Sequence, residues 1–386
     1  MNFSLLTPAK IIFGDGSADQ IAPILKSWDC PVLFVTSAHH PSLNQVKESL
    51  TAAGVEHYVE SVHGEPTIRK VEELTKFAKD HHCGAVLAMG GGSVLDSGKA
   101  VSAMINNPGN IMDYLEVVGA GKPLQNPAVN MLAVPTTAGT GSEVTKNAVI
   151  LVEDKHVKVS LRSDWMVPTV ALIDPLLTIS LPPEITASTG MDALTQVIEP
   201  YVSCKANTMT DLFCEAGIQA ASQSLLAAYQ NGGDHEARRK MAWASLLGGL
   251  SLANAGLGAV HGFAAVLGGM YDAPHGSICA RLLPIVFETN ARVLAAAGNQ
   301  QSYLKRFEQV ARWLAGHESA TIKDGVDFLE MLAAAMDIPY LSEFGVCGED
   351  IPEIVEKARK ASSMKGNPIV LNDTTLSEIM IRAIGK

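Results

Sequence analysis

Short apolar runs alternate with amphipathic stretches along the first half of the chain. Bounded by turn residues, the clearest apolar runs predict strands over Pro31–Ser37, His57–Val62, Gly84–Gly90 and Asn130–Thr136. Between them, Ser42–Gly54 and Thr67–His82 carry apolar residues at helical spacing. This alternation of strand and helix predicts a largely parallel α/β sheet.

The pattern changes near residue 180. Before it, further strands are predicted over Asn147–Asp154, Lys158–Arg162 and Thr169–Pro175. After Pro182 and Pro183, long helical patterns follow with few strand signals. We therefore predict an α/β domain over residues 1–180 and an all-helical domain over residues 181–386.

One segment of the helical half, Met241–Tyr271, contains no charged residue and exceeds the ~20 residues that span a bilayer. Its many glycines, together with Asn254 and His261, make it a poor lipid-facing helix. Small residues also let helices pack closely inside a large domain. We predict two buried helices with a break near Asn254–Gly258, and no membrane span.

Composition narrows the class of protein. A formal net charge of −11 and a pI near 5.5 argue against a nucleic-acid binder, which needs concentrated Lys and Arg. The six cysteines are scattered without a C-x-x-C pair, so buried, reduced thiols are expected. The N-terminus lacks a basic start followed by a long apolar run, so no signal peptide and a cytoplasmic location are expected.

A glycine-rich loop follows the strand predicted to end at Gly90. Gly90, Gly91 and Gly92 let the backbone approach a ligand closely. The helix predicted from Ser93 offers free N–H groups and the positive end of its dipole, which suits a pyrophosphate. The spacing is not G-x-G-x-x-G, so a simple tight strand-to-helix turn is the alternative.

A second polar loop, Pro135–Thr145, follows a later strand. Its hydroxyl groups could line the sugar and phosphates of the same nucleotide, and they belong to Thr136, Thr137, Thr140 and Ser142. An open α/β sheet binds its ligand at the carboxyl ends of its strands, where both loops are predicted to lie. Surface loops with hydroxyls that cap helices are the alternative.

Two histidines and an aspartate could form a metal site in the helical half. Asp192, His261 and His275 supply one carboxylate and two ring nitrogens, the ligand set of many open catalytic metal sites. Gln196 stands one helical turn after Asp192 and shares its face. Because a lone buried histidine is more often a hydrogen-bonded core residue, that interpretation stays open.

Four segments together resemble the signatures of the iron-containing (group III) alcohol dehydrogenases: Gly90–Ala100, Pro135–Thr145, Gly190–Ser203 and Gly258–Gly276. Pro8–Ser17 and Pro168–Pro183 are similar to the family too, so the resemblance runs to about residue 285. It implies an N-terminal dinucleotide-binding domain and an all-helical C-terminal domain, an architecture shared with dehydroquinate synthases. It also implies an active site in the cleft between the two domains.

The resemblance implies roles for individual residues. Gly90, Gly91, Gly92, Ser93 and Asp96 would hold the pyrophosphate and the nicotinamide side of the cofactor, and Thr136, Thr137, Thr140 and Lys158 would flank its phosphates and ribose. Asp192, His261 and His275 fall on three of the four metal positions of the family.

Three departures from the family pattern matter. The fourth metal position, normally His, is Gln196, whose amide oxygen is a weaker neutral ligand. A further His, usually close to the nicotinamide, is Ala265. Ser37 replaces the Asp that many members place against the adenosine ribose, which leaves both NAD and NADP open. Three protein ligands with an open position suit zinc as well as iron, so one Fe²⁺ or Zn²⁺ ion is expected.

The resemblance implies an NAD(P)-dependent, metal-assisted alcohol dehydrogenase that interconverts a small alcohol and its aldehyde or ketone by hydride transfer. It would act as a homodimer or larger homo-oligomer, without a nucleic-acid or membrane partner. The alternatives are a metal-independent reductase of an acidic oxo substrate that uses Arg162 or Lys146, a dehydroquinate synthase-like lyase, and a non-catalytic nucleotide-binding descendant.

Overall fold

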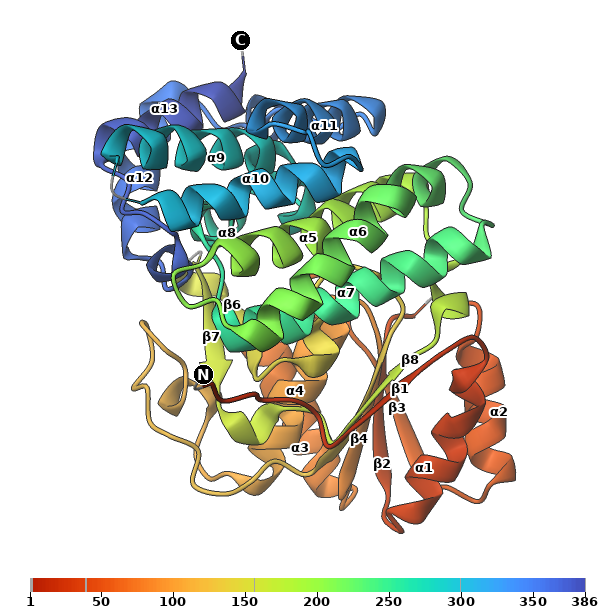
Figure 1. Ribbon diagram of the computed structural model, residues 1–386. Helices are drawn as coiled ribbons and strands as arrows, with labels where there is room; N and C mark the ends of the chain where they lie inside the picture. The colour runs from red at the N-terminus through yellow and green to blue at the C-terminus, as the bar shows by residue number, and fades with distance from the viewer. Residues whose placement is uncertain (1–2, 39, 156, 299, 386) are drawn as a thin grey trace. The chain divides into compact units, whose positions relative to one another are not determined.

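The computed structural model describes residues 3–38, 40–155, 157–298 and 300–385, and these form two compact units (Figure 1). An α/β unit contains Leu6–Thr137 and Gly141–Ser180. A helical unit contains the chain from Leu181 onward, together with residues 3–5 and the short segment Ala138–Thr140. The combination of a parallel-sheet domain with an all-helical domain confirms the fold class predicted from the sequence.

The sheet of the α/β unit has six strands among the described residues, and every neighbouring pair is parallel. Their spatial order is β1 (Lys10–Phe13), β8 (Val170–Ile173), β5 (Asn130–Pro135), β4 (Ala85–Gly90), β2 (Val32–Thr36) and β3 (His57–Ser61). The strands predicted within the first 136 residues are confirmed as β2, β3, β4 and β5.

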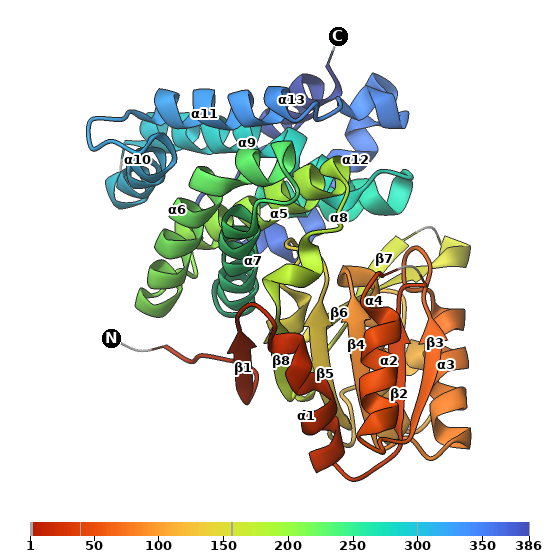
Figure 2. The ribbon, with the colours of Figure 1, turned by 90° about the vertical axis from the view of Figure 1, so that its right-hand side faces the viewer.

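Helices cover both faces of this sheet, which explains why the central strands β2 and β4 are buried at every position. Successive side chains of a strand point to opposite faces, so Val32 and Phe34 of β2 join one core, while Leu33 and Val35 join the other. The helices that pack on the first core are α1 (Ile21–Ser27) and α2 (Leu43–Ala52), and those on the second are α3 (Ile68–Asp80) and α4 (Gly92–Asn106) (Figure 2).

Two of the predicted strands lie outside the main sheet. β6 (Asn147–Val152) and β7 (Val157–Arg162) pair with each other in antiparallel fashion as a separate two-stranded sheet. Alternate residues of β6, including Ala148 and Ile150, are buried in the same core as α3 and α4. The sequence pattern predicted these strands but gave no sign that they leave the parallel sheet.

The helical unit has no strand among its described residues. Its α-helices are α5 (Pro183–Val202), α6 (Thr208–Gln230), α7 (His235–Ala255), α8 (Ala259–Met270), α9 (His275–Ala297), α10 (Gln301–Ala315), α11 (Ile322–Ala335), α12 (Ile351–Lys360) and α13 (Asp373–Ile384). The central helix, α5, is buried along most of its length, and Gly190 brings it close to α6. A Cβ atom at Gly190 would lie only 2.2 Å from Cδ1 of Leu225.

The uncharged segment forms two helices, as predicted. α7 ends at Ala255, Gly256 adopts a φ of 68°, and α8 leaves at an angle of 99°. A positive φ favours glycine, which explains why the chain turns at this residue. None of the described helices is by itself long and apolar enough to cross a membrane, and only α7 and α8 counted together meet that test.

Candidate active site

The two polar loops of the α/β unit lie at the same edge of the sheet. β4 is placed between β2 and β5, and Gly90 at its end is in register with Pro135. From β2 the chain continues outward to β3, and from β4 it continues outward to β5 on the other side. The carboxyl ends of β2 and β4 therefore flank the switch point where open α/β sheets bind ligands. Ser37 follows one of these strands and Gly91 the other.

The first turn of α4 has backbone donors to offer. Gly91 is its N-cap, and no side chain caps this end of the helix. By contrast, the Thr67 hydroxyl caps α3 and accepts a hydrogen bond from the Lys70 N–H group at 3.1 Å. A Cβ atom at Gly91 would lie 3.3 Å from Cγ2 of Thr137, so the two loops touch each other. The structure thus brings Gly90–Ser93 together with Thr136 and Thr137 around an open helix N-terminus.

A buried polar network fixes the second loop to α4. Asp96 accepts hydrogen bonds from the Ser142 hydroxyl at 2.5 Å and from the Val149 N–H group at 2.8 Å. Nζ of the fully buried Lys99 lies 3.1 Å from Asp96 Oδ1 and donates to the Thr145 hydroxyl at 2.9 Å. Lys99 was missed at the sequence level, although it lies one helical turn after Asp96 and faces the same way.

The remaining predicted cofactor residues lie elsewhere. Thr140 belongs to the segment Ala138–Thr140 of the helical unit, where a Cβ atom at Gly139 would lie 2.7 Å from Cβ of Thr189. Lys158 lies on the β6–β7 hairpin, where its Nζ is 3.0 Å from a carboxylate oxygen of Glu65.

In the helical unit, side chains from three helices converge on one point. Asp192 comes from α5, His261 from α8, and His275 and Cys279 from α9. One donor atom from each residue can be chosen so that all four atoms lie within 4.8 Å of one another. Asp192, His261 and Cys279 are buried, whereas the His275 side chain is 38% exposed. The three residues predicted from the sequence are therefore brought together, with a cysteine beside them.

The two imidazoles present the same atom to this group. Nε2 of His261 lies 3.3 Å from Asp192 Oδ1, and Nε2 of His275 lies 3.8 Å from the same oxygen. The Cys279 Sγ atom is 3.9 Å from the first nitrogen and 3.7 Å from the second. Cys279, expected from the sequence only as a buried free cysteine, lies four residues after His275 and so shares one face of α9 with it.

The expectation of buried thiols is wrong for two cysteines. Cys204 and Cys347 are exposed, and Cys30 is partly exposed. All six cysteines are free, as expected, and Cys83, Cys214 and Cys279 are buried.

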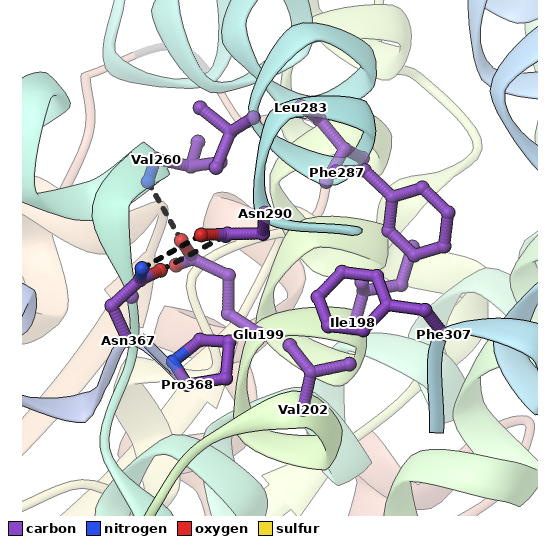
Figure 3. A pocket seen from close by; sticks show the side chains of 12 residues that line it. Ile198, Glu199, Val202, Val260, Leu283, Phe287, Asn290, Phe307, Asn367 and Pro368 are labelled. Atoms are coloured by element: carbon purple, nitrogen blue, oxygen red, sulfur yellow. Dashed lines mark hydrogen bonds between the residues drawn. The ribbon is translucent and has the colours of Figure 1, made fainter. Parts of the chain in front are cut away.

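A buried carboxylate orients His261. Nδ1 of His261 lies 2.7 Å from Oε2 of Glu199. Oε1 of Glu199 accepts a hydrogen bond from the Val260 N–H group at 2.7 Å (Figure 3). Beside them, the side-chain amides of Asn290 and Asn367 exchange hydrogen bonds of 3.0 and 2.8 Å, and Asn367 Oδ1 also accepts the Ala259 N–H group at 3.2 Å. A carboxylate on one ring nitrogen fixes the tautomer and orientation of a histidine whose other nitrogen is free to bind a metal.

Both units have counterparts of known family. Residues 8–175 match the profile of iron-containing alcohol dehydrogenases, and residues 186–384 match that of the C-terminal part of Fe-containing alcohol dehydrogenases. The chain belongs to the iron-containing alcohol dehydrogenase family. The resemblance found in the sequence is thereby confirmed, and this protein is an alcohol oxidoreductase.

Relatives of this iron-containing alcohol dehydrogenase align along almost its full length. Alcohol dehydrogenase 4 of Saccharomyces cerevisiae (strain YJM789) is 34% identical over 382 residues, or 97% of each chain. The solved structure of a 1,3-propanediol oxidoreductase has a TM-score of 0.91 at 31% identity and covers 99% of this chain and 100% of its own. A sulfoacetaldehyde reductase from Bifidobacterium kashiwanohense, solved in complex with NAD⁺, has a TM-score of 0.88 at 28% identity, covering 100% and 99%.

The converging side chains of this dehydrogenase fit a divalent metal ion. Asp192 Oδ1 and Gln196 Oε1 are buried, and neither accepts a hydrogen bond from any described residue. Buried acceptors without donors are rare in folded proteins, and a cation at this point would satisfy Asp192 Oδ1. The donor set of a carboxylate, two imidazoles and a thiol also consists of ordinary ligands for divalent transition metals.

The charges of the group point the same way. Burial by itself would raise the pKa of Asp192, but His261 and His275 hold it below its ordinary value. Burial opposes a proton on His261, yet Cys279, Asp192 and Glu199 raise the pKa of that histidine well above its usual range. The group thus attracts positive charge, which a proton supplies when no metal is bound.

Two of the positions where this dehydrogenase departs from the family pattern, Gln196 and Ala265, differ in their exposure to solvent. Gln196 is buried one turn after Asp192, and it helps to lower the pKa of Asp192. Ala265, one turn after His261 on α8, is exposed.

The cations considered for an acidic substrate are all paired. Lys146 is 2.8 Å from Asp164, Arg162 is 3.7 Å from Glu116, and Lys158 bonds to Glu65. Neither these pairs nor the family assignment favours the lyase or the reductase of an acidic substrate.

Proposed function

We propose that this alcohol dehydrogenase uses NAD(H) and a divalent metal ion held by Asp192, His261 and His275 to interconvert an uncharged alcohol and its aldehyde or ketone. The observation that carries the proposal is the convergence of these side chains around the unsatisfied Oδ1 atom of Asp192. When bound there, a divalent ion supplies Lewis acidity, which lowers the pKa of an alcohol and polarises a carbonyl group.

The chain's own residues hold the cofactor and the ligand geometry. The uncapped N-terminus of α4, with Gly91, Gly92 and Ser93, binds the pyrophosphate through backbone N–H groups. The hydroxyls of Thr136, Thr137 and Ser142 contribute at the phosphates and ribose. Asp96 supports the cofactor site indirectly. Its carboxylate accepts hydrogen bonds from Ser142 and Val149 and so fixes the second polar loop.

Glu199 keeps His261 ready to bind metal. By accepting a hydrogen bond from the Nδ1–H group, Glu199 leaves Nε2 unprotonated in the neutral ring. Its other oxygen accepts the Val260 N–H group and so anchors the ring to the first turn of α8. Gln196 occupies a position from which its amide either joins the ligands or supports Asp192.

The substrate class follows from the charges. A reductase of a carboxylate or sulfonate substrate needs unpaired Lys or Arg side chains near its site, and Lys146, Lys158 and Arg162 are each committed to an acidic partner. We therefore assign an uncharged primary or secondary alcohol as the substrate.

The cofactor is NAD(H) in this proposal. Ser37, at the end of β2, neither repels nor attracts a 2′-phosphate, but the relatives include an NAD-dependent methanol dehydrogenase from Bacillus methanolicus at 32% identity. Measuring kcat/KM with NAD⁺ and with NADP⁺ tests this assignment. Ser37→Asp is expected to raise the ratio in favour of NAD⁺ at least about tenfold, and a higher kcat/KM for NADP⁺ in the unaltered protein would overturn it.

The metal site is tested with His261→Ala. Formation of NADH from simple alcohols is expected to fall to background, while NADH binding, followed by fluorescence titration, stays unchanged. Unaltered turnover in this variant would refute the proposed site.

A further inference from the structure

Cys279 stands out among the metal-site residues because no role has been assigned to its thiol. We propose that the Cys279 thiolate is a fourth protein ligand of the metal. It takes the place of the imidazole that is missing because Gln196 stands at the fourth metal position, and it makes zinc rather than iron the resident ion. This inference rests on the proposed metal site and extends it from where the ion binds to which ion binds.

The spacing of the donor atoms matches a tetrahedral zinc site. With ordinary Zn–N, Zn–O and Zn–S distances, the edges of a regular tetrahedron are about 3.4 Å between O and N and about 3.6 Å between S and N. Asp192 Oδ1 lies 3.3 and 3.8 Å from the two Nε2 atoms, and Cys279 Sγ lies 3.7 and 3.9 Å from them. These four of the six edges of the tetrahedron fall within about 0.5 Å of the expected values.

A hydrogen-bonded thiol alone does not account for this group. Weak S–H contacts to His261 and His275 would leave Asp192 Oδ1 buried without a hydrogen bond. Asp192 and Cys279 are both buried, so bulk water does not reach Asp192 Oδ1 from the side of the sulfur atom. A cation at the centre satisfies the carboxylate, both ring nitrogens and the thiolate at once.

Gln196 is a poorer candidate for the fourth ligand. It lies one helical turn after Asp192 on the same face of α5, where an amide can position a neighbouring ligand. An amide oxygen is also hard and neutral, whereas a thiolate is soft and charged. Soft sulfur donors favour zinc over Fe²⁺, whereas a set of carboxylate and imidazole ligands alone is also used to bind Fe²⁺.

The burial of the ligands leaves an accessible side. The Cys279 side of the group is closed, while the His275 side chain is 38% exposed. Four protein donors would complete the coordination of a zinc ion, and the exposed His275 side is the side from which a substrate would approach it.

Cobalt(II) substitution tests the thiolate. The full chain, stripped of metal with a chelator and reloaded with Co²⁺, is expected to show an intense near-ultraviolet thiolate-to-cobalt charge-transfer band. Cys279→Ala should lose this band. Cys214→Ala, which changes another fully buried cysteine of the helical unit, should keep it, and so should Gln196→Ala. A band that survives Cys279→Ala, or is absent from the unaltered protein, overturns the proposal.

A second measurement needs no variant. X-ray absorption at the zinc edge of the zinc-loaded, unaltered protein is expected to show one sulfur at about 2.3 Å among nitrogen and oxygen ligands. A shell of nitrogen and oxygen only would refute the thiolate ligand. When Zn²⁺ and Fe²⁺ compete at equal concentrations, the ratio of bound zinc to bound iron should be at least about tenfold lower in Cys279→Ala than in the unaltered protein.

The outcomes separate this inference from the proposed function. Alcohol-dependent formation of NADH with a metal that has no sulfur ligand would refute the role of Cys279 and leave the dehydrogenase standing. A sulfur-ligated metal in a protein that does not oxidise alcohols would refute the proposed function and leave Cys279 as a metal ligand.

Discussion

Nε2 of His261 points toward Asp192 and Cys279 because Nδ1 of the same ring is held 2.7 Å from Glu199. Glu199 lies on α5, the helix that also carries Asp192, and the two residues are separated by two helical turns. One face of α5 therefore supplies both a ligand and the carboxylate that aims a second ligand. The geometry of the metal group depends on this helix more than on any other element.

Replacing the orienting carboxylate should weaken metal binding without removing a ligand. In Glu199→Gln the amide no longer offers a charged acceptor to His261, and losses of about 10–100-fold in metal affinity are expected for such partners. Competition with a chromophoric chelator measures the affinity. Glu184→Gln, at the exposed first turn of the same helix, is the matched control. Equal affinity in Glu199→Gln and the control would contradict the role of Glu199.

The pair of buried amides beside Glu199 should behave as a unit. Asn290→Ala or Asn367→Ala leaves the other amide without its partner, at a cost of about 1–3 kcal/mol each. Removing both should cost less than the sum of the two single changes, because no orphaned partner remains in the pair. Thermal unfolding of the four proteins measures this coupling, and strictly additive losses would show that the two side chains act independently.

The contact between the two cofactor loops should be sensitive to side-chain size at Gly91. The γ carbons of a valine there would meet Thr137, because even Cβ would lie 3.3 Å from its methyl group. Gly91→Val is expected to weaken NADH binding at least about tenfold by pushing the loops apart. Gly348→Val, where Cβ would meet nothing within 4 Å, controls for the added volume. Unchanged NADH affinity in Gly91→Val would remove this loop from the cofactor site.

The buried Glu143 should make stability depend on pH. Burial raises the pKa of its carboxyl group to about 7, from 4.5 in the unfolded chain. The folded protein therefore holds a proton that the unfolded chain releases, and the free energy of unfolding falls as pH rises between these values. The expected change is on the order of 2–3 kcal/mol. Glu143→Gln should remove this dependence, so the Tm of the variant minus the Tm of the unaltered protein should increase as pH rises from about 5 to about 8. Parallel Tm profiles would contradict the pKa shift.

The features that the sequence predicts best are those with a local pattern. β2 and β4 are continuous apolar runs, and the glycines near residue 256 mark the turn between α7 and α8. Periodicity also places Asp192 and Gln196 on one face of a helix. The same argument relates His275 to Cys279 and Asp96 to Lys99, so those residues could have been found from spacing.

Other parts of the site have no local signal. Glu199 and His261 are 62 residues apart, and Asn290 and Asn367 are 77 residues apart, so only the folded arrangement of α5, α8, α9 and the segment around Asn367 brings them together. The pairing of β6 with β7 is similar, since alternation identifies a strand but not its partner.

The bond from Asn367 to the first turn of α8 has a consequence for biosynthesis. This residue accepts the Ala259 N–H group across a separation of 108 residues, and all the proposed ligands are synthesised before it. A nascent chain from which Asp192, His261, His275 and Cys279 have already emerged therefore carries the ligands without the amide that steadies the start of α8. Insertion of the metal becomes a late event in the life of the chain, and translation products that stop short of residue 367 should accumulate with little metal.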